Sequence, residues 1–176
     1  MTTKTTGLTK TVYTIGHSTR KLDDFVTMLL SFQINTLVDV RAYPGSRWFP
    51  HFNKEKLRTA LALHRIEYVH LKDLGGRRDA DSKSEDKRAK KNSAFDGYAL
   101  YMKTEPYKIA LAELEVLAQQ KAVAFMCAEA DWRKCHRSLM ADGLVETGWN
   151  VAHITAVEQS EPHAFTKYAD LKNKLF

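Results

Sequence analysis

Reactive and charged side chains recur in four short segments, each directly after an apolar stretch. The segments are Gly16–Arg20, Asp39–Ser46, Asp73–Gly76 and Cys127–Ser138. Histidine can move protons near neutral pH, arginine and serine bind anions, and a thiol can act as a nucleophile. If the fold brings the four segments together, they predict one chemical site.

Five side chains in these segments are candidates for the chemistry itself. They are His17 and His136 for proton transfer, Cys127 as a nucleophile, and Asp39 and Glu129 to orient these groups or to bind a metal ion. Each has a structural alternative, since His17 can bond a loop carbonyl and Cys127 can pack as a small buried thiol. The sequence leaves these alternatives open.

Six further residues are candidates for binding an anion: Ser18, Arg41, Ser46, Gly75, Gly76 and Arg137. Arg137 stands at the expected start of a helix, where unpaired N–H groups and the helix dipole favour negative charge. A guanidinium there can bind a phosphate or carboxylate with two parallel hydrogen bonds. The alternative is that an arginine pairs with Asp39 or Glu129 and holds a loop.

A metal ion is a further question, because zinc binds thiolate and imidazole ligands and the sequence offers Cys127, Cys135, His136 and His17. Recognisable zinc sites pair their ligands at spacings of about two to four residues, whereas seven residues separate Cys127 from Cys135. Carboxylates of Asp39, Asp73 and Glu129 could instead bind magnesium, provided that they lie within a few ångströms of one another. We therefore predict no metal ligands and keep a divalent metal ion as an alternative cofactor.

Five apolar segments predict the strands that position these residues: 11–15, 36–40, 66–71, 122–126 and 151–155. Helical spacing of apolar residues predicts helices over about 21–33, 53–64, 95–120 with a break at Pro106, and 135–147, with a further helix in the tail from Ser160. This alternation predicts a Rossmann-like α/β fold, a mostly parallel five-stranded sheet with helices on both faces. Such sheets bind ligands beyond the carboxyl ends of their strands, where the four segments fall.

Length and composition predict a single α/β domain over residues 11–176, preceded by a flexible lead-in at 1–10. The segment 77–91 is highly charged and lacks large apolar residues, which predicts an exposed loop. No apolar run is long enough for a membrane span, and two cysteines form no disulfide framework, so we expect a cytoplasmic protein with no membrane partner. The net charge of +6 favours anionic partners such as nucleic acid, nucleotides and phosphate esters.

The order of several short blocks resembles the family called domain of unknown function 488. The blocks are Tyr13–Ser18, Asp39–Arg41 with Pro44 and Ser46, Leu74–Gly76, Phe95–Met102, and Cys127–Glu129 leading to Cys135–Arg137. They run from about Tyr13 to Ile154 and leave out the charged segment 77–91. The resemblance implies one compact cytoplasmic α/β domain, and it implies no reaction, because the family's activity is not established.

From the residues we predict an enzyme-like protein that acts on a phosphate-bearing substrate, nucleic acid or nucleotide, at the carboxyl edge of the sheet. Arg41 and Arg137 would hold the anion. One alternative is a non-catalytic nucleic-acid-binding module that uses the segment 77–91 and the loop Arg47–Phe49. Another is a redox or regulatory protein based on its two thiols. The sequence does not predict the oligomeric state.

Overall fold

The protein is built around one six-stranded sheet, seen in a computed structural model that describes residues 10–76 and 87–168, with 87–93 as helix backbone only. The strands are β1 (Thr11–Gly16), β2 (Thr36–Asp39), β3 (Glu67–His70), β4 (Val123–Cys127), β5 (Asn150–Ala156) and β6 (Gln159–Pro162). Their order across the sheet is β3-β2-β4-β1-β5-β6. The first five strands are parallel, and β6 runs antiparallel to β5.

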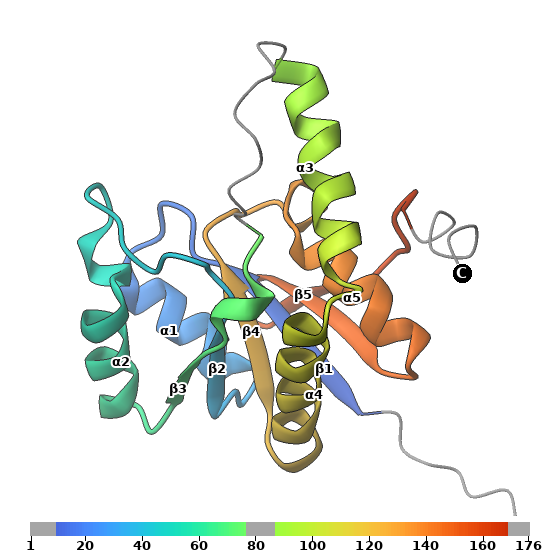
Figure 1. The fold of residues 1–176 in the computed structure, drawn as a ribbon. Coiled ribbons are helices and arrows are strands. Elements are labelled where there is room, and N and C mark those ends of the chain that lie inside the picture. The colour runs from blue at the N-terminus through green and yellow to red at the C-terminus, as the bar shows by residue number, and fades with distance from the viewer. Residues whose placement is uncertain (1–9, 77–86, 169–176) are drawn as a thin grey trace, which may run out of the picture.

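Within the described ranges, five α-helices and three short 3-10 turns connect the strands (Figure 1). The helices are α1 (Leu22–Ser31), α2 (Lys54–Leu63), α3 (Lys87–Tyr101), α4 (Glu105–Gln120) and α5 (Arg137–Glu146), and the turns are η1 (Pro50–Phe52), η2 (Lys72–Leu74) and η3 (Trp132–Lys134). None of the helices in the described ranges has the length and apolar character needed to cross a membrane.

The two faces of the sheet carry two separate hydrophobic clusters, because neighbouring residues of a strand point to opposite faces. In β4, Val123 and Phe125 pack with the helices α3, α4 and α5. The alternate residues Ala124 and Met126 pack with α1 and α2. The prediction of a mostly parallel α/β sheet covered on both faces is therefore confirmed, with one more strand than the five expected.

Two sequence expectations need correction. Residues 159–162 form the strand β6 and not the start of a helix, and no helix follows as far as Tyr168; residues 169–176 lie outside the described chain. Residues 87–91, expected in the charged loop, begin α3 because lysine, arginine and alanine favour helix and no proline or glycine interrupts them. The rest of that loop, residues 77–86, and residues 1–9 of the expected lead-in also lie outside the described ranges.

Candidate functional site

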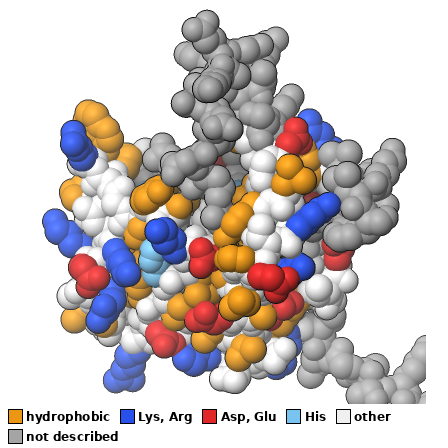
Figure 2. Space-filling view, viewed as in Figure 1, with side chains coloured by type: hydrophobic (Ala, Val, Ile, Leu, Met, Phe, Trp, Pro, Cys, Tyr) orange, Lys and Arg blue, Asp and Glu red, His pale blue; other side chains and the backbone are white. Residues whose placement is uncertain are grey.

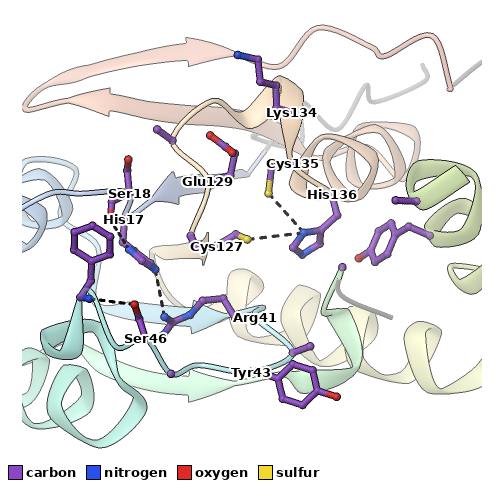
Figure 3. A pocket seen from close by; sticks show the side chains of 18 of the residues that line it. His17, Ser18, Arg41, Tyr43, Ser46, Cys127, Glu129, Lys134, Cys135 and His136 are labelled. Carbon is purple, nitrogen blue, oxygen red and sulfur yellow. Dashed lines mark hydrogen bonds between the residues drawn. The ribbon is translucent and has the colours of Figure 1, made fainter. Parts of the chain in front are cut away.

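A cleft of about 840 Å³ opens at the carboxyl ends of β1, β2 and β4 (Figure 3). Eight of the eleven residues predicted for catalysis or anion binding line it: His17, Ser18, Arg41, Ser46, Gly76, Cys127, Glu129 and His136. The other three, Asp39, Gly75 and Arg137, lie behind lining residues and contact them. The fold thus brings the predicted residues together, and their individual roles stay predictions.

Arg41 is clamped in the cleft wall by a buried ion pair with Asp39. Nε of Arg41 donates to Oδ1 of Asp39 at 2.9 Å, and Nη2 donates to Oδ2 at 2.5 Å. Nη2 also donates to the Phe52 carbonyl at 2.8 Å, and the hydroxyl of Tyr68 donates to Asp39 at 2.6 Å. Burial alone would lower the pKa of Arg41, but its hydrogen bonds with Asp39 raise that pKa above the ordinary value. The guanidinium is therefore a fixed, permanent cation.

His17 is held beside Arg41 as a neutral ring. Because arginine can only donate, Nη1 of Arg41 donates to Nε2 of His17 at 3.3 Å. The proton of the ring then sits on Nδ1, which donates to the Ser18 carbonyl at 2.9 Å. Burial is the main reason why the pKa of His17 falls to about 4. At neutral pH this ring therefore has no charge, and it stacks on Phe52 with ring centroids 4.3 Å apart.

Two thiols and an imidazole meet on the opposite wall of the cleft. The Nδ1 atom of His136 lies 3.6 Å from Sγ of Cys135 and 3.9 Å from Sγ of Cys127. The turn η3 returns the chain to the end of β4. The Asp131 side chain caps η3 by accepting a hydrogen bond from the Arg133 N–H. A Cβ atom on Gly76 would come within 2.4 Å of the His136 ring, so only glycine leaves that ring in place.

The two thiols differ in their affinity for protons. The hydrogen bond with Cys135, together with burial, raises the pKa of Cys127 well above the ordinary value. Burial also opposes ionisation of Cys135, but that hydrogen bond, His136 and Arg137 outweigh burial and lower the pKa of Cys135 well below the ordinary value. Nε of Arg137 donates to Sγ of Cys135 at 3.4 Å. A thiolate at Cys135 would therefore have a buried guanidinium as its neighbour.

Arg137 belongs to a hydrogen-bonded chain beneath the cleft and does not line it. Its Nη1 donates to Oγ1 of Thr14, which donates to Nδ1 of His153. Nε2 of His153 donates to His163, and Nε2 of His163 donates to Asp142. With one proton on each ring, every bond has one donor and one acceptor. No carboxylate lies within 4 Å of Arg137 in the part of the chain that the structure describes.

The cleft is also lined by residues that the sequence pattern marks only as aromatic or charged. Aromatic side chains of Tyr43, Phe49, Phe95 and Tyr98 contribute to its walls, and the exposed Lys134 also lines it. Helical spacing places Tyr98 on an apolar face but does not distinguish the core from a cleft wall. Tyr98 belongs to both the core and the cleft wall. Its side chain is 2% exposed, and its ring centroid lies 5.1 Å from that of His136 in an edge-on contact.

The carboxylates suggested as magnesium ligands do not converge. Asp39 is engaged by Arg41, and Asp73 is not among the residues that line the cleft. Over residues 10–76 and 94–168, the one group of histidine, cysteine and acidic side chains close enough to share an ion is Cys127, Cys135 and His136. The ligand set suggested by the structure therefore contains sulfur and nitrogen atoms.

Comparison with known proteins gives one result. The family model described as "Domain of unknown function DUF488" matches residues 21–144. The matched range contains Arg41 and Gly76 as well as the group of Cys127, Cys135 and His136. His17 and Ser18 precede this range. Neither the curated proteins nor the solved structures gave a match.

Proposed function

The chain belongs to the family of domains of unknown function DUF488, and we propose that it is an enzyme whose cleft takes a phosphate-bearing substrate of nucleotide size. The observation that carries this proposal is the preorganised guanidinium of Arg41. Among the described residues, Asp39, the Phe52 carbonyl and His17 occupy four of its five N–H groups. The fifth, on Nη1, is left for a ligand. A cation that is already fixed loses little entropy when it binds an anion.

Two further polar groups that line the cleft favour an anion. The hydroxyl oxygen of Ser46 accepts a hydrogen bond from the Phe49 N–H at 3.1 Å, so its proton remains available for a ligand (Figure 3). Lys134 adds a second positive charge to the cleft lining. Among the described residues that line the cleft, Glu129 is the one carboxylate, since Asp39 lies behind Arg41. The polar groups in this cleft therefore favour negative charge.

The size and walls of the cleft favour a nucleotide or a nucleic-acid end over a duplex. Small-molecule sites have volumes of about 300–1,000 Å³, and this cleft has about 840 Å³. Aromatic rings such as Tyr43 and Phe49 stand next to the cationic groups and can stack on a base. The thiols and His136 complete the opposite wall, where they would face the reacting part of a substrate held by Arg41.

Binding of ATP, AMP and inorganic phosphate, measured by calorimetric titration at low salt, tests the proposal. Lys134→Gln should weaken nucleotide binding about 2–5-fold, which corresponds to the 0.5–1 kcal/mol of an exposed charge contact. Lys108→Gln is the matched control, because both lysines pair with an acidic residue three positions earlier and are 62% and 57% exposed. Equal effects of the two variants, or no binding of any of the three compounds, would overturn the proposal.

A nucleic-acid-binding module is the second candidate, because Trp48 is 87% exposed next to the exposed Arg47. An exposed tryptophan beside a cation can stack on the bases of a single strand. On the face drawn in Figure 2, Lys and Arg side chains are mixed with Asp and Glu and form no continuous basic stripe. Calorimetric titrations of Trp48→Ala with ATP and with single-stranded RNA or DNA test this function. Trp48→Ala should leave ATP binding unchanged. A loss confined to single-stranded RNA or DNA would favour this second function.

A further inference from the structure

We propose that Cys127, Cys135 and His136 form a zinc site in the wall of the cleft, with one coordination position open to the cleft. The three side chains come from the end of β4, the residue after η3 and the residue before α5. Their ligand atoms lie within 4.8 Å of one another. The part that this ion plays towards a phosphate-bearing substrate rests on the function proposed above, whereas the binding of the ion does not.

The distances match those of a tetrahedral zinc ion. Zinc binds thiolate sulfur at about 2.3 Å and imidazole nitrogen at about 2.0–2.1 Å. At the tetrahedral angle these bonds place sulfur and nitrogen about 3.6 Å apart. The observed separations from Nδ1 of His136 are 3.6 Å to Cys135 and 3.9 Å to Cys127. Both sulfur–nitrogen separations are therefore within a few tenths of an ångström of the tetrahedral value, and the two sulfur atoms lie within 4.8 Å of each other.

The chemistry of the donor set favours zinc over the harder magnesium and calcium ions. Thiolate and imidazole ligands select zinc and related soft or borderline metals, whereas magnesium and calcium take oxygen ligands. Two thiolates would neutralise the charge of a divalent ion. The site would then place little net charge beside the buried cation of Arg137, which donates to Sγ of Cys135 at 3.4 Å.

The surroundings hold the three ligands in position. Arg137 donates to Sγ of Cys135 and is itself fixed by Thr14 and by the Glu129 carbonyl. Such contacts to ligand atoms orient metal-binding side chains in proteins. Gly76 allows the His136 ring to pack against the backbone. The site is therefore built by the fold and not by a flexible loop alone.

Three protein ligands with an open fourth position are typical of catalytic zinc sites, whereas structural sites use four. All three ligands line the cleft, as do Arg41 and Ser46. An ion at this place can polarise a phosphate oxygen or a bound water molecule. The cleft would then combine a fixed guanidinium on one wall with a Lewis acid on the other.

Cobalt titration of the reduced, metal-free full chain tests the site directly. Co²⁺ in a tetrahedral thiolate site gives a near-ultraviolet charge-transfer band and strong visible bands. We expect both bands to reach a plateau at one ion per chain and to disappear when zinc displaces cobalt. Cys127→Ser, Cys135→Ser and His136→Asn should each weaken cobalt binding by more than the roughly 10–100-fold that loss of an outer contact costs. His64→Asn, at the exposed end of α2, is the control and should bind as the wild type does.

Protection of the thiols provides a measurement that needs no variant. One equivalent of Zn²⁺ should slow the reaction of both cysteines with a thiol reagent, and a chelator should restore it. Absence of the charge-transfer band, or thiols that one equivalent of Zn²⁺ leaves unprotected in the reduced protein, would each overturn the zinc site. Nucleotide titration of the metal-free protein is read separately, so a failure of the proposed function is distinguishable from a failure of the zinc site.

Discussion

Replacement of Asp39 with asparagine tests whether the buried ion pair holds Arg41 in the cleft wall. Asp39 is completely buried and accepts hydrogen bonds from the Arg41 backbone and side chain and from the Tyr68 hydroxyl. Asparagine keeps the shape but leaves Arg41 as a buried cation without its carboxylate. Breaking one side of a buried pair costs about 3–5 kcal/mol of the free energy of unfolding. In a chain of this length that loss lowers the Tm by roughly 6–20 °C.

Urea unfolding at pH 7, followed by circular dichroism, measures this loss. Tyr68→Phe is the control, because it removes one hydrogen bond to the same carboxylate at a cost of about 1.5–3 kcal/mol. The double variant Asp39→Asn/Arg41→Met should lose less stability than the two single variants added together, since it removes both charges. A loss below about 1 kcal/mol for Asp39→Asn, or strict additivity in the double variant, would refute the reasoning.

Two further predictions concern the cleft wall that holds Cys127, Cys135 and His136, and the chain of hydrogen bonds beneath the cleft. Gly76→Ala should displace the ring of His136 and weaken cobalt binding at least about 10-fold. Gly97→Ala is the control and should leave cobalt binding unchanged, because its Cβ meets nothing within 4 Å. Equal cobalt binding by the two variants would contradict the prediction. Burial, His163 and Arg137 lower the pKa of His153 to about 2. As the pH falls through about 6.5, His153 therefore binds a proton in the unfolded chain but stays unprotonated in the folded chain. Stability should therefore be full above pH 6.5 and fall by about 2 kcal/mol between pH 7.5 and 5 through this group. Urea unfolding at both pH values should show a smaller fall in His153→Gln, and an identical fall would exclude His153 as its source.

The regular elements that bury two faces could be predicted from the sequence, and β6 could not. Residues 122–126 are apolar throughout and residues 36–40 are mostly apolar, because β4 and β2 lie in the sheet interior between two helix layers. Strand β6 has the sequence Gln-Ser-Glu-Pro and pairs with β5 at the edge, mostly exposed. Its pairing comes from backbone hydrogen bonds, so no periodic pattern of apolar residues marks it.

The position of the site could be predicted because parallel strands end at one edge of a sheet. That rule placed His17, Arg41 and Cys127 together, and the structure does so. The grouping of Cys127, Cys135 and His136 could not be read from spacing, because the turn η3 shortens a seven-residue gap that looks too long in the sequence. The burial of Arg137 could not be predicted from the sequence either, because no carboxylate marks it. Its partners are the Thr14 hydroxyl, the Glu129 carbonyl and the Cys135 thiol.

The central position of β1 has a consequence for the order in which the protein forms during synthesis. Tyr13 pairs with Ala124 and Val12 pairs with Val151, so a strand made first finds both of its neighbours only in the last third of the chain. Such distant pairings form slowly and leave apolar surface uncovered in the meantime. The cleft needs β1 for one wall and β4 for the other. A nascent chain that has not yet released β4 from the ribosome therefore lacks the wall that carries Cys127 and cannot complete the cleft.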